Sequence, residues 1–251
     1  MPIPILVACI AKGHTVPNRF VRKLEKFEKL SKTDRQAILD LCQNIRKVGA
    51  RKVMLERGDL SYLFVAGLAC RYQMLEDGTR QITDFIVPGD LCNGYAVLPD
   101  SGIASLAACS VAYIAPEHLA RIMERHPRIS RALWRLSVAE AAVLRAWTAN
   151  IGGRPADKRV AHMLCELCVR LGTLEQPSNN SSVLPLSQVD LADATALSPV
   201  HINRVLGRLR DRRLVGLQRR SITVKDIKRL MTFAQFNGAY VQALSDVPQD
   251  A

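Results

Sequence analysis

The sequence is short of acidic residues and has no long apolar run. It counts 23 Asp and Glu against 35 Lys and Arg among 251 residues, which gives a formal net charge of +12. No stretch approaches the roughly 18 consecutive apolar residues that a membrane-spanning helix needs. The first residues contain two prolines and no Lys or Arg before Lys12, so they lack the basic start of a secretory signal peptide. We therefore expect a soluble protein that does not enter a membrane, with a disordered or loosely packed N-terminus.

A disulfide framework is not indicated either. The seven cysteines are an odd number, and several of them lie inside apolar runs. Scattered cysteines of this kind are typical of small buried side chains in a reducing compartment. The sequence therefore predicts a cytoplasmic protein.

The composition is otherwise that of a globular chain. Hydrophobic residues make up 48% and charged residues 23%, which excludes an intrinsically disordered chain, and the length fits one large domain or two smaller ones. The surplus of basic residues points to a polyanionic partner, either nucleic acid or an anionic membrane surface. The total charge does not choose between these two partners.

The first half of the chain contains a helical pattern followed by a strand pattern. Residues 20–48 carry apolar side chains at helical spacing, with Ser31 or Thr33 as a helix cap before Asp34. Residues 50–116 are short runs rich in β-branched and aromatic residues, cut by frequent turn signals, and such a pattern predicts an antiparallel β-roll. The clearest hairpin joins residues 70–75 to residues 80–87, with Gly78 in the turn.

A long helix follows a short one at residues 117–124. Residues 128–151 carry an apolar seam that one acidic residue interrupts. The residues of this seam are Ile129, Leu133, Leu136, Glu140, Val143 and Trp147. Such a helix packs either against its own copy as a coiled coil or against the β-roll of its own chain, and periodicity leaves both open. A Gly-Gly-Arg-Pro sequence at 152–155 breaks the helix and marks a domain boundary.

Residues 187–212 read as two short helices joined by a tight turn. Ser187 caps the first helix, which runs to Thr195, and Pro199 stands in the first turn of the second. The second helix has apolar residues on one face, whereas its other face carries His201, Arg204 and Arg208, with Asn203 beside them. This arrangement is that of a helix-turn-helix, in which Arg and Asn read base edges in the major groove of DNA.

A short basic hairpin follows the second helix. Residues 214–217 and 221–224 are strand-like, and the turn between them carries Arg219 and Arg220, as in the wing of a winged helix-turn-helix. Residues 199–229 hold ten Lys and Arg and only two acidic residues, a local charge of +8. Much of the remaining surplus lies on residues 19–52, for which the sequence indicates no partner. Duplex DNA is therefore favoured over a membrane surface.

The stretch from Leu186 to Arg210, LSQVDLADATALSPVHINRVLGRLR, resembles the helix-turn-helix of the Crp/Fnr family of bacterial transcription regulators. The resemblance covers roughly residues 20–235, because the parts of the chain come in the order of that family. These parts are the β-roll with its Pro88-Gly-Asp sequence, the long helix, and the winged helix-turn-helix of residues 187–224, which we call the reader. It implies an α+β fold with three parts. These are a cyclic-nucleotide-binding-like antiparallel β-roll over residues 1–127, a dimerisation helix over 128–153, and a winged helix-turn-helix over 154–251.

The resemblance also implies a homodimer paired through the seam of the long helix, reading a double-stranded, pseudo-palindromic operator. Arg204 matches an arginine that the family keeps, whereas Val200 stands where many members carry a glutamate, so we expect an operator different from the best-known one. Val200 either touches a thymine methyl or packs inward. The expected DNA-contacting residues are Ser187, Gln188, Ser198, Pro199, Val200, His201, Asn203, Arg204, Arg208, Arg219 and Arg220.

No cofactor is predicted, and the effector is not indicated. The family binds cyclic AMP through a Glu and an Arg after Pro-Gly-Asp, but this chain has no such Glu, and no Arg between residues 81 and 120. Only Cys9 precedes Cys42, which does not support a four-cysteine iron–sulfur cluster. No His lies between residues 14 and 118, so a haem ligand in the roll is not supported.

One cluster leaves an alternative open. His162, Cys165 and Cys168 recur every third residue on a predicted helix, as weak candidates for a metal site or a redox switch. No fourth metal ligand is evident, so the pattern favours small residues packed under the second helix of the helix-turn-helix. The alternative to a regulator with an unknown effector is thus an effector-independent one, or one that responds to redox state or metal through these residues.

Two other classes of function are weighed against a regulator. A nucleotide-handling enzyme needs a glycine-rich phosphate loop, a nucleophile triad or paired carboxylates, and none of these patterns is present, so we expect no enzymatic activity. A ligand-binding module that has lost DNA binding conflicts with the arginines of the second helix and the hairpin. An activator also needs a surface for RNA polymerase, which one sequence does not identify.

Overall fold

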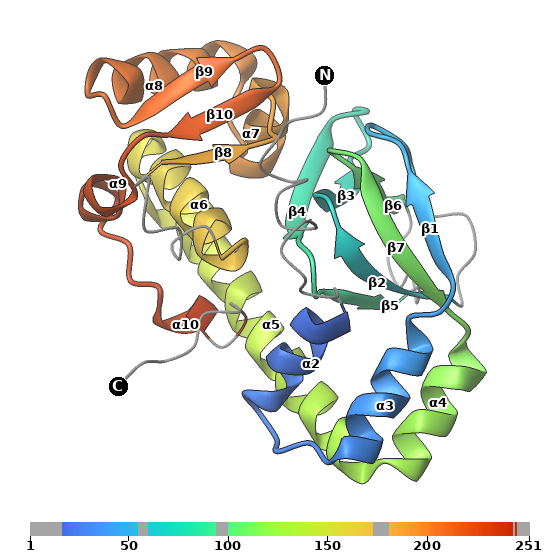
Figure 1. Ribbon diagram of the computed structural model, residues 1–251. Coiled ribbons are helices and arrows are strands. Elements are labelled where there is room, and N and C mark those ends of the chain that lie inside the picture. Colours follow the sequence, from blue (N-terminus) through green and yellow to red (C-terminus); the bar gives the residue numbers. More distant parts are fainter. Residues whose placement is uncertain (1–16, 55–59, 94–99, 173–180, 243, 245–251) are drawn as a thin grey trace. The chain divides into compact units, whose positions relative to one another are not determined.

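The computed structural model describes residues 17–54, 60–93, 100–172, 181–242 and 244, which form two compact units (Figure 1). The first unit comprises Met1–Met74 and Phe85–Val138, and the second comprises Leu75–Asp84 and Ala139–Ala251. The N-terminal segment before residue 17 and most of the polar linker after residue 172 lie outside the described residues. Among the described helices, none is long and apolar enough to cross a membrane.

The first unit begins with two helices instead of one continuous helical segment. α2 is Pro17–Glu25 and α3 is Lys32–Leu41. Ser31 caps α3, with Asp34 N donating to Ser31 Oγ at 3.1 Å and Ser31 N donating to Asp34 Oδ2 at 2.9 Å. The prediction of helix to residue 48 is wrong at its end, because residues Ile45–Val48 form strand β1. Ile45 matches the helical spacing of the apolar residues before it, but its side chain is 45% exposed and does not pack in the core as that spacing implied.

The β-roll prediction is confirmed by two antiparallel sheets. One has the order β1-β7-β2-β5, and the other the order β4-β3-β6. The strand bounds are β2 Ser61–Ala66, β3 Ala69–Met74, β4 Arg80–Ile86, β5 Leu91–Asn93, β6 Ser101–Ser105 and β7 Cys109–Ile114. The core between these strands contains Tyr62, Phe64, Ile86, Ile103 and Val111, all of which are buried.

The Pro88-Gly-Asp sequence serves the packing of this unit. Asp90 Oδ1 lies 2.7 Å from Lys23 Nζ of α2, and both side chains are buried. Asp90 Oδ2 also accepts a hydrogen bond from the Val87 amide at 2.8 Å. Gly89 adopts a φ of 91°, a conformation that favours glycine. The motif therefore holds α2 against the turn that precedes β5.

The hairpin between β3 and β4 forms as predicted. Gly78 has a φ of 79°, and the Leu75 amide donates to the Thr79 carbonyl at 2.8 Å. Asp77 Oδ1 closes the turn by accepting from the Thr79 amide at 2.8 Å. The tip of this hairpin and the first five residues of β4, together Leu75–Asp84, belong to the second unit.

The long helix exists, but its predicted seam does not face outward. α4 is Pro116–Arg125 and α5 is Pro127–Gly153. The single chain buries four of the six seam residues, namely Ile129, Leu136, Val143 and Trp147, with exposed fractions of 1% to 4%. Leu133 and Glu140 are half-buried at the border of that face. The large apolar side chains of α5 that are exposed are instead Trp134, Val138 and Leu144, at 68%, 50% and 49%. In the single chain the seam therefore packs within its own subunit, and the contacts of a dimer stay a prediction.

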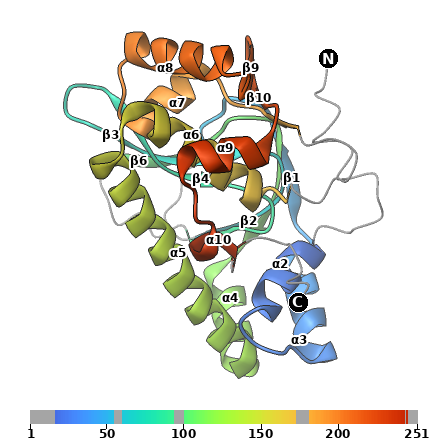
Figure 2. The ribbon, with the colours of Figure 1, turned by 90° about the vertical axis from the view of Figure 1, so that its left-hand side faces the viewer.

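The second unit has the expected reader. Its helices are α6 Ala156–Arg170, α7 Gln188–Thr195, α8 Pro199–Asp211, α9 Ile227–Ala234 and α10 Ala239–Gln242. Strands β9 Val215–Gln218 and β10 Ser221–Val224 form the predicted hairpin, and β8 Ser182–Leu184 adds an unpredicted third strand beside β10. Figure 2 shows α7 lying beside α8, with β9 and β10 following α8.

Candidate nucleic-acid interface

The first reader helix is fixed at both ends by local hydrogen bonds. Ser187 N and Oγ donate to Asp190 Oδ2 at 2.8 and 2.7 Å, and the Asp190 amide donates back to Ser187 Oγ at 3.2 Å. This reciprocal cap satisfies amides that an α-helix leaves open at its start. At the other end Ala196 adopts a left-handed conformation with a φ of 52°. The chain therefore turns within three residues into the next helix.

The second reader helix, α8, starts as the sequence indicates. Ser198 Oγ accepts a hydrogen bond from the His201 amide at 3.2 Å, and Pro199 occupies the first turn, where no amide is needed. Its inner face consists of four residues with exposed fractions of at most 1%, namely Ile202, Val205, Leu206 and Leu209. Packing of this face fixes which residues of α8 point to solvent.

The outer face of α8 carries the side chains expected to read bases. His201, Asn203 and Arg204 are exposed, and Val200 is 62% exposed. The structure thus places Val200 outward and not in the core, with Ser198 and Pro199 exposed next to it. A row of one Arg, one Asn and one His on the first two turns has the donors and acceptors that major-groove edges of bases require.

Two predicted contact residues are already engaged within the chain. Arg208 lies further along α8 and makes an ion pair with Asp157 of α6, with Nε 2.8 Å from Oδ2 and a second bond to Oδ1. The Ser187 hydroxyl is taken up by its helix cap, and both Ser187 and Gln188 are half-buried. Apart from Arg208, the expected contact residues of α8 therefore lie on its first turns and face solvent.

The hairpin after α8 presents its arginines at the tip. Ser221 pairs with Gln218 in the β9–β10 register, which leaves Arg219 and Arg220 as the two turn residues, both exposed. Exposed arginines on a tight turn suit contacts with phosphate oxygens, which carry no sequence information.

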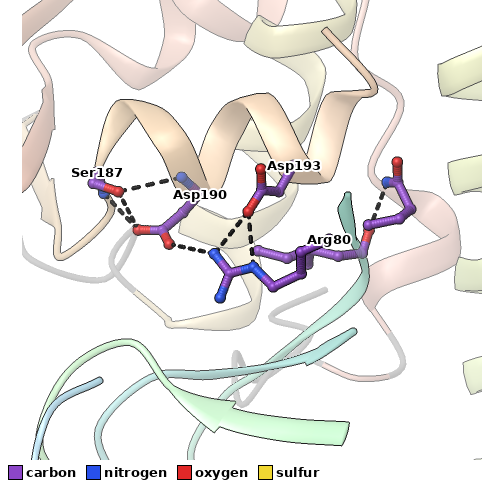
Figure 3. A network of polar contacts seen from close by, with 6 residues as sticks. Arg80, Ser187, Asp190 and Asp193 are labelled. Atoms are coloured by element: carbon purple, nitrogen blue, oxygen red, sulfur yellow. Dashed lines mark hydrogen bonds and ion pairs between the residues drawn. The ribbon is translucent and has the colours of Figure 1, made fainter. Parts of the chain in front are cut away.

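An arginine of the β3–β4 hairpin contacts α7. Arg80 Nε lies 2.8 Å from Asp193 Oδ2, and Arg80 Nη2 lies 2.7 Å from that oxygen and 3.3 Å from Asp190 Oδ1 (Figure 3). The Asp190 side chain is fully buried, and its other oxygen holds the α7 cap. One guanidinium thus bridges two carboxylates that lie one helical turn apart.

Comparisons with known proteins agree with this geometry. Residues 158–233 match the family model of the Crp-like helix-turn-helix domain. The nitrogen fixation regulation protein FixK of Rhizobium meliloti is 30% identical over 165 residues, which are 64% of this chain and 73% of that protein. This chain belongs to the Crp/Fnr family.

Other members of the Crp/Fnr family match over more of the chain. The transcriptional activatory protein AadR of Rhodopseudomonas palustris is 28% identical over 85% of this chain and 90% of its own length. The solved structure of FixK2 from Bradyrhizobium japonicum has a TM-score of 0.64 at 23% identity, and the match covers 75% of this chain and 96% of that one. The fold is therefore that of Crp/Fnr regulators over both units.

The cysteine and histidine cluster of this Crp/Fnr protein lies in the core of α6. His162, Cys165 and Cys168 have exposed fractions of 2%, 0% and 0%, and within the described part of the chain no His, Cys, Asp and Glu side chains group as a metal site. Burial raises the pKa of the Cys165 thiol and lowers that of His162 to about 4. A neutral buried thiol reacts slowly. This geometry favours packing over a metal or redox role.

Three ion pairs around α7 and α8 join residues that are far apart in the sequence, so local sequence patterns do not predict them. Asp157 pairs with Arg208 across 51 positions of chain, and Arg80 meets Asp190 and Asp193 across 110 and 113 positions. Spacing along a helix or strand carries no signal for such distant partners. In this chain the pairs nevertheless join α8 to α6, and α7 to the β3–β4 hairpin.

Proposed function

We propose that the protein is a dimeric, sequence-specific DNA-binding transcription regulator of the Crp/Fnr type. The observation that supports this function best is the exposed row on the first turns of α8, consisting of Val200, His201, Asn203 and Arg204. These side chains project from a helix whose inner face is fully packed, so they have a defined direction. A helix of this kind enters the major groove with its N-terminal residues against the bases.

Each residue of the row has a base that suits it. Arg204 donates two hydrogen bonds to a guanine, and Asn203 both donates to and accepts from an adenine. Val200 brings an apolar surface to a thymine methyl group. Arg219 and Arg220 at the hairpin tip bind phosphates and set the register of the reader on the duplex.

We place the homodimer contact on the exposed face of α5. Trp134, Val138, half-buried Ala141 and Leu144 follow one another at spacings of four, three and three residues, so they share one side of the helix. An exposed apolar stripe on a 27-residue helix is unusual for a monomer and suits a coiled-coil partner. Two copies then read two half-sites about 34 Å apart on a pseudo-palindromic operator.

The signal is proposed not to be cyclic AMP. Residues 81–120 hold no Arg or Lys to neutralise a cyclic phosphate, and burying that charge unpaired is costly. Isothermal titration with cyclic AMP is expected to show no binding, and micromolar affinity would contradict this. The buried thiols of α6 likewise give no support to a redox-responsive regulator.

The relatives suggest where such a protein acts. AadR is named a transcriptional activatory protein, and FixK a nitrogen fixation regulation protein. By analogy we propose a regulator in the bacterial cytoplasm, where the chromosome lies. Activation by contact with RNA polymerase and repression by blocking it are separated by the position of the operator relative to the promoter.

The test is to select binding sites from a pool of random duplexes and to measure affinity for the selected site at several salt concentrations. We expect an enriched pseudo-palindrome, and an affinity that falls steeply with salt because basic side chains displace counterions from phosphates. A pool without enrichment, together with affinity insensitive to salt, would exclude this function.

A further inference from the structure

The first helix of the reader is held by a residue that lies far away in the sequence. α7 has eight residues, and a helix of this length has little stability of its own. Its cap uses one oxygen of Asp190, while the other oxygen of the same carboxylate faces Arg80 at 3.3 Å. Arg80 therefore acts on the start of α7 and on Asp193 in its next turn together.

A second ion pair holds the same strand against the reader. Asp84 Oδ1 lies 2.9 Å from Arg170 Nη1 of α6, and the Arg170 side chain is 5% exposed. Residues 80, 82 and 84 share one face of β4, and Ile82 between the two charged residues is fully buried. The strand thus contacts α7 with a cation and α6 with an anion, which fixes its register against both helices. All these partners belong to the second unit.

The position of α7 decides how α8 is presented. The two helices pack against each other and are joined by only three residues, with Ala196 in a left-handed conformation. A short, conformationally restricted turn passes a tilt of the first helix on to the second. The first turns of α8 carry Asn203 and Arg204, whose base contacts depend on orientation within a few tenths of an ångström.

We propose that Arg80 is a positioning residue for operator reading. Through its bonds to Asp190 and Asp193 it holds α7, and with it the turn into α8, in the orientation that presents Asn203 and Arg204 to base edges. This inference rests on the proposed function. It assigns to the β3–β4 hairpin a part in sequence discrimination that its distance from the reader in the sequence does not suggest.

The variants for the test are Arg80→Gln, Arg80→Lys, Asp193→Asn and the double variant Arg80→Gln with Asp193→Asn. Glu76→Gln is the matched control, because Glu76 is an exposed charged residue of the same hairpin. Two readouts are needed. The first is hydrogen–deuterium exchange of the α7 amides in DNA-free protein. The second is the ratio of affinities for the selected operator and for random duplex, with the melting temperature measured alongside.

We expect Arg80→Gln to accelerate exchange in α7 and to lower the operator-to-random ratio by roughly fivefold to tenfold, with affinity for random duplex nearly unchanged. Arg80→Lys is expected to retain only part of the wild-type operator-to-random ratio, because an ammonium lacks the planar fork that bridges two carboxylates. The double variant is expected to be no worse than Arg80→Gln alone, since both changes remove one interaction.

Three results would decide against the proposal or against its basis. Unchanged α7 exchange and an unchanged ratio in Arg80→Gln overturn it. An equal loss of affinity on both duplexes with a lower melting temperature also overturns it, because that is the signature of a structural role alone. If wild-type protein prefers no operator, the proposed function fails, and the α7 exchange rates then decide by themselves whether Arg80 holds that helix.

Discussion

Arg208 of α8 and Asp157 of α6 form an ion pair with two hydrogen bonds, the longer of which joins Nε and Oδ2 at 2.8 Å. The two side chains are 48% and 26% exposed, so solvent screens the pair. Exposed pairs of this kind contribute little to stability. In the DNA-free protein Arg208 is therefore paired with Asp157, and a DNA phosphate can compete with this carboxylate for the guanidinium.

Replacing Asp157 with Asn is expected to release Arg208 for DNA. We predict a higher affinity for random duplex, with a salt dependence steeper by about one ion, and little change in stability. Fluorescence anisotropy at several salt concentrations measures both. Asp211→Asn is the matched control, because it removes the same charge from exposed Asp211 of α8 and leaves the Asp157 pair intact. Equal effects of the two variants would show that only the net charge matters.

A charge on the exposed face of α5 is expected to separate the dimer. Val138 is 50% exposed in the single chain, so Val138→Glu costs the isolated subunit little, whereas a buried glutamate in an apolar helix pair is strongly unfavourable. Sedimentation equilibrium is expected to give a dimer for wild type and a monomer for the variant. Val53→Glu, at a position 60% exposed in the first unit, serves as control and keeps the dimer. A Val138→Glu variant that stays dimeric would refute this interface.

His162 of α6 is expected to make the second unit less stable in acid. Burial, with a smaller contribution from the charge of Arg154, lowers the pKa of His162 from 6.5 to about 4. Between these values the unfolded chain binds a proton that the folded chain does not, so stability is complete above pH 6.5 and falls as the pH drops toward 4. The loss from this one group is at most about 3 kcal/mol. Denaturant titrations at pH 7 and pH 4.5 measure it.

His162→Phe is expected to remove this part of the acid loss, because a phenyl ring has no proton to bind. The ring also suits its surroundings, since Phe236 and Tyr240 lie 4.8 and 6.1 Å from the imidazole between ring centres. His118→Gln, at an exposed histidine of α4, is expected to leave the acid loss as in wild type. The interpretation fails if His162→Phe loses as much stability between the two pH values as wild type does.

The reader was predictable from the sequence because its signals are local. Ser187 and Ser198 stand where caps are needed, Pro199 falls in a first turn, and the apolar residues of α8 keep helical spacing. Each of these signals involves residues within four positions of one another. Local hydrogen bonds and local packing decide such elements, so the sequence alone was sufficient for α7, α8 and the hairpin of β9 and β10.

The remaining features depend on partners far away in the sequence. Ile129 and Trp134 are both apolar residues of α5, and only the packing of the folded chain buries the first at 1% exposed and leaves the second at 68%. Strand β8 has three residues and exists because β10 offers it a free edge. The contact of Arg80 with Asp193 likewise needs the tertiary structure. Periodicity identified that α5 is amphipathic, but not which partner its apolar residues meet.

The central claim is that α8 reads bases while the hairpin after it binds phosphates. It is tested most directly by measuring the affinities of Arg204→Ala and Arg219→Ala for the selected operator and for random duplex in the same buffer. We predict that Arg204→Ala weakens operator binding by about 1 to 3 kcal/mol and random binding much less, so that discrimination falls. Arg219→Ala is predicted to weaken both by a similar factor. An equal loss on both duplexes for Arg204→Ala would contradict the assignment of α8 as the base reader.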